Sequence, residues 1–319
     1  MHYTQFKQIY EHLIADAIDR IRAGVTSKLH EITQCTCVFP DVEEAVLLVP
    51  MYSFGVAAHT ITPRIEHLKI VVRNSGKSCL DYFLKCSLDE LEGICDQTIM
   101  PQDCVAGTRA ERFGDYFTRL YEVRKRAKKI DGMDLRKFLV FADEFPSQQE
   151  FTTAFKLLKS LPGVGPAAAQ HVLMELGWPI VKPDRHIQKI LSRLGGWESH
   201  FQFDKATNTA KSAGEWYKFQ LDWCDAVRQV NAKKPSMDQS FDGDVAELGR
   251  AGMHLPDLSV INSRQVDLCL MFFSQTKKLS ELGLAEPRCT DTPACSRCKV
   301  PDCKGRRSSD GSPASGMLR

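Results

Sequence analysis

The feature that most limits what this chain can fold into is a five-residue glycine-rich turn, LPGVG at residues 161–165. Before the turn, Ser147 and Glu150 have the spacing of a capping box, which predicts the start of a helix. After the turn, Pro166 suits the first turn of a second helix, which we predict over residues 167–176. The backbone N–H groups of such a turn point outward at a helix N-terminus. The pattern therefore predicts a helical hairpin whose turn can bind a phosphate without reading a base.

A second feature follows the hairpin, in the run Lys182-Pro183-Asp184-Arg185. Apolar residues then recur at helical spacing, which places Asp184 at the N-cap of a further helix. Capping alone explains an isolated aspartate at such a position, because it stabilises a helix by about 1 kcal/mol. Glycine-rich turns between helices are also common. Taken separately, each feature therefore keeps a purely structural interpretation.

The combination of features is more informative than each one alone. It consists of the turn, the Gly-Trp-Pro at 177–179 and the Asp-x-His-Ile helix start at 184–187. They resemble the helix-hairpin-helix-Gly-Pro-Asp signature of the endonuclease III superfamily of DNA glycosylases. The resemblance is close over residues 151–195 and looser over 89–129. It implies an all-α fold of two lobes, a helical barrel lobe and an iron–sulfur lobe, with double-stranded DNA between them. It also implies that the target base is flipped out of the stack.

The resemblance assigns the catalytic role to Asp184. Breaking an N-glycosidic bond builds positive charge on the sugar. A nearby carboxylate stabilises that charge and can orient or deprotonate the attacking water. The DNA-binding role falls on the turn and on the two cations beside the aspartate, namely Leu161, Gly163, Val164, Gly165, Lys182 and Arg185.

One position departs from the lyase-competent members of the superfamily. They carry a lysine two residues after the second glycine of the turn, and it forms a Schiff base with the sugar. Here that position is Ala167, so we expect a monofunctional DNA N-glycosylase in which water attacks. A bifunctional glycosylase and lyase that uses a displaced lysine, such as Lys182, is one alternative. A non-catalytic iron–sulfur DNA-binding module is another. Residues 47–60 lack the glutamate of the adenine-removing branch, which disfavours that specificity.

Four of the twelve cysteines fall within fifteen residues, with the spacing C-x5-C-x2-C-x4-C. In a reducing compartment such a cluster indicates a metal site rather than disulfides. Four thiolates at this spacing can bind a [4Fe–4S] cluster or a zinc ion. The resemblance favours the [4Fe–4S] cluster over zinc. The expected ligands are Cys289, Cys295, Cys298 and Cys303.

Aromatic residues outside the hairpin are interpreted mainly as packing groups. Tyr52, Phe54 and His59 lie in the segment that in relatives lines the base pocket or fills the gap left by the base. We expect core packing for the first two. Trp216 and Trp223 lie in a long helical pattern, and we expect most of the aromatic residues there to pack as well.

The rest of the chain shows helical periodicity, with no strand series and no internal repeat. We expect five parts along it. They are a helix within residues 1–38 that packs on the iron–sulfur lobe, the helical lobe with the hairpin at 39–181, the iron–sulfur lobe at 182–303, an insertion inside it at about 201–261, and a disordered tail at 304–319.

Composition sets wider bounds on function. Of the 319 residues, 43% are apolar and 26% charged, which is typical of a globular protein of one or two domains. A formal net charge of +2 does not by itself indicate a nucleic-acid partner. No stretch approaches the ~20 apolar residues of a membrane helix, and Glu11 and Asp16 make the N-terminus unlike a targeting peptide. We expect a cytoplasmic, nucleoid-associated monomer that repairs DNA or attacks foreign modified DNA.

Overall fold

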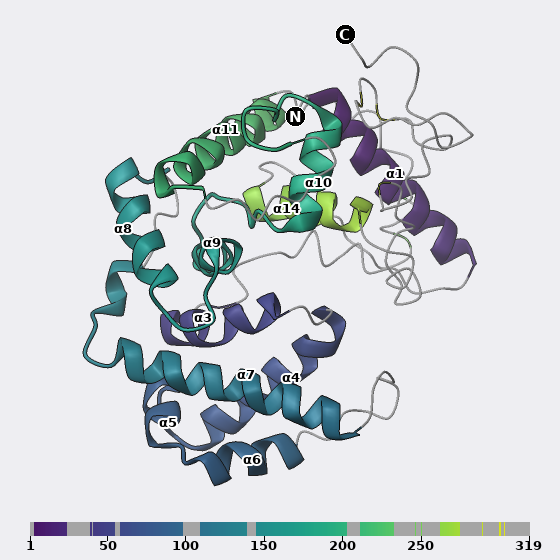
Figure 1. Cartoon of the computed structure of the whole chain (residues 1–319). Coiled ribbons are helices and arrows are strands. Elements are labelled where there is room, and N and C mark those ends of the chain that lie inside the picture. Colours follow the sequence, from purple (N-terminus) through teal and green to yellow (C-terminus); the bar gives the residue numbers. More distant parts are fainter. Residues whose placement is uncertain are drawn as a thin grey trace. The chain divides into compact units, whose positions relative to one another are not determined.

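The computed structural model is all-α within the part of the chain that it describes (Figure 1). Every regular element there is a helix, and no strand is present among these residues, which confirms the all-α part of the prediction. None of the helices in these described segments is long and apolar enough to cross a membrane. The described residues are 3–23, 39, 41–54, 58–97, 109–138, 145–202, 211–232, 246, 250, 262–274, 289, 300 and 303.

The chain divides into two compact units. One is continuous and runs from Cys37 to Trp178. The other is discontinuous and combines Met1–Thr36 with Pro179–Arg319. The hairpin therefore belongs to the continuous unit, and Asp184 belongs to the discontinuous one.

Helix α7 is the central element of the continuous unit. It buries Leu120, Val123 and Ala127 and packs against α3, α5 and α6; Figure 1 shows α7 running beside α5 and α6. The hairpin is formed by α8 and α9, and α9 packs on the short helix η1. The helices of this unit are α3 (Val42–Leu48), η1 (Val49–Ser53), α4 (Ala58–Asn74), α5 (Cys79–Lys85), α6 (Leu88–Gln97), α7 (Arg109–Ile130), η2 (Leu135–Phe138), α8 (Gln148–Lys159) and α9 (Pro166–Glu175).

Helix α14 is the central element of the discontinuous unit, because α1, α10 and α11 all pack against it. The first helix contributes Phe6, Ile9 and Leu13 to this core. It also contributes Gln5, whose side-chain amide donates to the carbonyl of Leu194 at 2.7 Å. The helices of this unit are α1 (Tyr3–Arg22), α10 (Arg185–Leu194), α11 (Ala213–Ala232) and α14 (Ser263–Ser274).

Aromatic side chains from α11 and the preceding loop pack together in the same unit. Trp216 and Trp223 are buried, as expected for packing groups. The ring of Phe219 lies against those of Trp197 and Phe201, with centroid distances of 5.7 and 4.9 Å. Most of the expected insertion, and all of the expected tail, lie outside the described residues.

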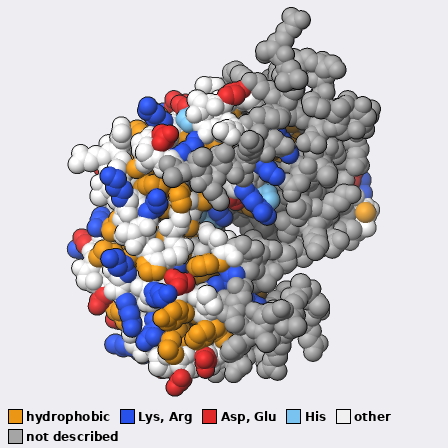
Figure 2. Space-filling view, viewed as in Figure 1, with side chains coloured by type: hydrophobic (Ala, Val, Ile, Leu, Met, Phe, Trp, Pro, Cys, Tyr) orange, Lys and Arg blue, Asp and Glu red, His pale blue; other side chains and the backbone are white. Residues whose placement is uncertain are grey.

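Charged side chains are dispersed over the visible surface. On the face drawn in Figure 2, the described Lys and Arg side chains are spread among acidic, apolar and polar ones. The formal net charge of +2 likewise provides little overall attraction for a polyanion.

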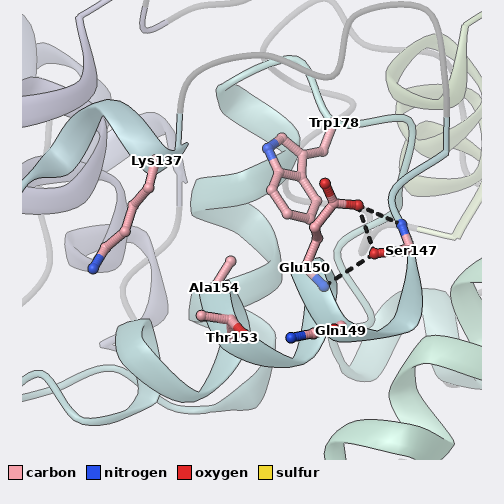
Figure 3. A pocket seen from close by; sticks show the side chains of 7 residues that line it. All are labelled: Lys137, Ser147, Gln149, Glu150, Thr153, Ala154 and Trp178. Carbon is pink, nitrogen blue, oxygen red and sulfur yellow. Dashed lines mark hydrogen bonds between the residues drawn. The ribbon is translucent and has the colours of Figure 1, made fainter.

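The capping box predicted at the start of α8 is confirmed. Ser147 Oγ accepts from the N–H of Glu150 at 3.3 Å, and Glu150 Oε2 accepts from the N–H of Ser147 at 2.8 Å (Figure 3). The side-chain and backbone hydrogen bonds from Ser147 lower the pKa of the Glu150 carboxyl. The stabilisation by the ionised carboxylate is therefore present above its unfolded-state pKa, and it is lost as the pH falls through the lowered pKa.

Replacing Ser147 by alanine should lower the free energy of unfolding by about 1 kcal/mol, because the first turn of α8 loses its cap. Urea titrations at pH 7 measure this. The matched control is Ser160→Ala at the other end of α8. Ser160 Oγ donates to Leu157 O at 2.7 Å, but that carbonyl also accepts from the Ser160 N–H. Equal losses in the two variants would contradict the capping role.

Candidate functional site

The hairpin turn presents its two glycines and buries its two apolar residues. Leu161 and Val164 are buried, whereas Gly163 and Gly165 are exposed. The Val164 N–H donates to the Leu161 carbonyl at 3.2 Å, so it is used inside the turn and is not offered to a ligand. The N–H groups of Gly163 and Gly165 meet no acceptor among the described residues. Of the four turn residues expected to bind DNA, the glycines supply the available donors.

The second helix of the hairpin begins without a side-chain cap. Gly165 is the N-cap of α9, and Pro166 is its first residue, as predicted. A proline lacks an N–H, so the remaining donors of the first turn start at Ala167, which is partly exposed. Two lysines on the last turn of α8, Lys156 and Lys159, are exposed just before the turn. Both donors and cations are thus available around the two glycines.

A buried arginine holds the turn in place. The Arg126 guanidinium, from α7, donates to the carbonyl of Pro162 at 3.1 Å and to that of Leu47 at 2.7 Å. Its side chain has no exposed surface. Burial lowers the pKa of Arg126 to about 9, so the group is still charged at neutral pH. Arg126 therefore ties the hairpin turn to the end of α3.

Gly163 is the position where the turn comes closest to the rest of the unit. Its φ of +72° lies in the left-handed region, which favours glycine. A Cβ at this position would lie 2.9 Å from Phe54 Cζ and 3.2 Å from Arg126 Nη1. Both the backbone conformation and the close packing thus require glycine here.

The segment around η1 packs inside the continuous unit. The Tyr52 ring lies 5.7 Å from the ring of His171 on α9, and its hydroxyl is 3.2 Å from Thr62 Oγ1. Phe54 lies between Gly163 and the guanidinium of Arg119, which is 5.2 Å from the ring centre. Packing is therefore observed for both aromatic residues. The side chain of His59 lies outside the described part.

Asp184 is the N-cap of α10, as predicted. Its Oδ1 accepts from the N–H groups of His186 and Ile187 at 2.9 and 3.0 Å. Its Oδ2 lies 3.7 Å from Lys182 Nζ, and the carboxylate side chain is 26% exposed. One oxygen thus fixes the orientation of the side chain, and the other is directed toward Lys182. Arg185, the next residue, is exposed.

Two buried glutamines hold the backbone that leads to Asp184. Gln220 Oε1 accepts from the Val181 N–H at 2.9 Å, and its Nε2 donates to the Val181 carbonyl at 2.7 Å. Gln188 Nε2 donates to the Pro183 carbonyl at 2.7 Å. These positioning residues were not anticipated from the sequence. The available signal was a glutamine at helical spacing between Trp216 and Trp223, on an otherwise apolar face.

Two of the four expected cluster ligands lie at the C-terminal end of α10, around Arg193. Arg193 Nη1 donates to Cys289 Sγ at 3.4 Å and to its carbonyl at 3.3 Å. Cys303 Sγ lies 3.3 Å from the Arg193 carbonyl. Cys295 and Cys298 lie outside the described residues, within which no group of three or more metal-binding side chains occurs.

One pocket lies in the continuous unit, beside the start of α8 (Figure 3). The buried indole of Trp178 forms one wall, and the exposed Lys137 lies at another. The full lining is Lys137, Ser147, Gln149, Glu150, Thr153, Ala154 and Trp178. None of the turn residues lines it, so it is not part of the candidate site.

Comparisons with protein-family models, with curated proteins and with solved structures gave no match. Function is therefore inferred from the hairpin, from Asp184 and from the cysteines.

A matched pair of alanine substitutions tests the geometry of the turn. Gly163→Ala should lower the free energy of unfolding by about 2–4 kcal/mol, because left-handed backbone and overpacking each add a cost. Gly165→Ala should change it by less than about 0.5 kcal/mol, because Gly165 has φ −82° and a Cβ added there would meet nothing within 4 Å. Urea or thermal unfolding measures both, and equal effects would contradict the described turn.

Proposed function

We propose that this protein is a monofunctional DNA N-glycosylase that excises a modified or mismatched base from double-stranded DNA. The proposal includes the two-lobed helix-hairpin-helix fold of the endonuclease III superfamily. The main support for it is the hairpin turn at residues 161–165, which Arg126 holds in place and in which Gly163 and Gly165 are exposed. We call it the braced turn. The capping carboxylate of Asp184 follows that turn in the chain at the spacing of the superfamily signature.

The turn is suited to the DNA backbone. Outward N–H groups at an uncapped helix N-terminus provide both donors and positive potential for a phosphate oxygen. Lys156 and Lys159, exposed on the last turn of α8, add positive charge just before the turn. Such contacts position a duplex without selecting a sequence, and they suit an enzyme that searches DNA for a rare base.

Asp184 supplies the chemistry in this proposal. The target nucleotide leaves the stack, so that its sugar becomes accessible. The bond between C1′ and the base nitrogen breaks, its electrons leave with the base, and the base takes up a proton. The Asp184 carboxylate stabilises the positive charge on the sugar, and it takes the proton of the water whose oxygen bonds to C1′. The products are the free base and an abasic site.

Two observations favour a reaction without a covalent intermediate. The lyase position is Ala167 on the first turn of α9, and it cannot form a Schiff base. The nearest lysine to Asp184 in the sequence, Lys182, is paired with the carboxylate at 3.7 Å. A lyase that acts through Lys182 is the second candidate, because the same distance places its amine beside the reacting group.

The cofactor proposed for the discontinuous unit is a [4Fe–4S] cluster bound by Cys289, Cys295, Cys298 and Cys303. The position of Cys289 and Cys303 beside Arg193 supports the proposal, because it brings two of the four proposed ligands to the same end of α10. When bound, the cluster would hold the end of the chain against α10. Asp184 caps the same helix at its other end, so the cluster would stabilise the element that presents the carboxylate.

Asp184→Asn should strongly slow base release and preserve the fold. Asparagine caps a helix about as well as aspartate, so the free energy of unfolding should change little. Losing the carboxylate should slow single-turnover release by about 10²–10⁴-fold. The assay uses duplexes that carry a panel of modified and mismatched bases, and strand breaks should appear only after hot alkali.

Other outcomes of that assay identify the alternatives. Strand breaks without alkali, together with a borohydride-trapped adduct that Lys182→Ala removes, would favour the lyase. An absence of base release from the whole panel, with tight salt-sensitive binding, would favour a non-catalytic module.

The protein purified without oxygen should be brown and contain about four iron ions per chain. Metal analysis and visible absorption measure this. Cys295→Ser should lose most of the iron, whereas Cys269→Ser, at a buried cysteine of α14 outside the cluster, should retain it. One zinc ion per chain and no iron would contradict the proposed cofactor.

A further inference from the structure

We propose that Arg126 is a positioning residue for DNA binding. Its buried guanidinium holds the hairpin turn in a phosphate-binding form, and it adds positive charge close to the exposed Gly163. The inference rests on the proposed function, and it identifies a residue that the motif itself does not contain.

The first support is the geometry of the guanidinium. Arg126 joins the carbonyl of Pro162, inside the turn, to that of Leu47, near the end of α3. A Cβ at Gly163 would be only 3.2 Å from its Nη1. The Arg126 guanidinium therefore lies close to Gly163, the exposed residue whose N–H is proposed to bind phosphate. A turn without this support would lose the contact that fixes one of its carbonyls.

The second support is the charge. Both acceptors of Arg126 are neutral carbonyls, and no described carboxylate lies within ion-pair distance of it. Buried charges are usually paired, because an isolated one is costly. Glu122, one turn earlier on α7, interacts with Arg126 only at longer range. The positive charge is thus not cancelled locally, and low-dielectric surroundings screen it less than water would.

A second arginine on the same helix supports the other side of the turn. Arg119 lies seven residues before Arg126, so both project from the same face of α7. It donates to the carbonyls of Met51 and Phe54 at 3.4 and 3.3 Å. Phe54 is the ring against which Gly163 packs. Helix α7 thus fixes both the turn and the surface below it.

The experiment compares a neutral and a charged replacement of Arg126. Arg126→Gln keeps a donor for one carbonyl and removes the charge, and Arg126→Lys keeps a donor and the charge. Fluorescence anisotropy measures the binding of an undamaged labelled duplex between 50 and 200 mM KCl. The matched control is Val123→Ala, which removes buried atoms from α7 three residues earlier.

Arg126→Gln should weaken binding about tenfold at 100 mM salt, as expected when a charge-assisted contact is lost. It should also reduce the slope of log K against log [salt] by about 1, corresponding to one phosphate. Arg126→Lys should keep most of the wild-type affinity and most of the wild-type salt slope. Val123→Ala should keep the wild-type affinity and slope although it lowers the melting temperature.

Three results would overturn the inference, and only the third would also contradict the proposed function. If Arg126→Gln binds with the wild-type affinity and slope, the inference fails and the proposed function stands. If Arg126→Lys binds as weakly as Arg126→Gln while both melt cooperatively, the charge has no role and the inference also fails. If the wild-type protein binds no duplex, the proposed function fails together with the inference.

Discussion

The contact between Arg126 and the carbonyl of Pro162 is the interaction on which the candidate site depends. A glycine-rich turn has little intrinsic preference for one conformation, because glycine samples many backbone angles at little cost. In this protein the Arg126 guanidinium and the Phe54 ring hold the turn in one conformation. The ring lies so close to Gly163 that a Cβ at this position would collide with it. The glycine amides can then be exposed without becoming mobile. Preorganised donors of this kind bind an anion with little loss of conformational entropy.

Buried polar side chains also hold irregular backbone in place at other positions of the chain. Gln220 pairs with both backbone groups of Val181, just before the lysine and aspartate of the proposed active site. The Arg193 guanidinium, at the end of α10, donates to the sulfur and the carbonyl of Cys289, one of the expected cluster ligands. In each case a side chain from a helix satisfies backbone or sulfur atoms in irregular chain, where regular hydrogen bonding is interrupted. The chemistry-bearing segments are thus supported by groups that take no part in the proposed reaction.

The sequence predicted the parts of the fold that depend on local rules. The capping box at Ser147, the proline start of α9 and the N-cap at Asp184 follow from residue preferences over a few positions, and all three are observed. The two compact units divide the chain after residues 36 and 178. The supporting residues could not be predicted in the same way. Arginines on α7 suggest a solvated face, and only tertiary packing buries Arg119 and Arg126. The internal use of the Val164 N–H likewise depends on how tightly the turn closes.

The central proposal is that the N–H groups of Gly163 and Gly165 in the braced turn donate hydrogen bonds to a DNA phosphate. The most direct measurement is a titration of the ¹⁵N-labelled protein with duplex DNA, following the amide resonances of Gly163 and Gly165. We expect both to move downfield on binding and to return when salt releases the duplex, because new hydrogen bonds to phosphate deshield the amide protons. If the duplex binds while both resonances stay in place, the turn is not the contact and the proposed binding mode is contradicted.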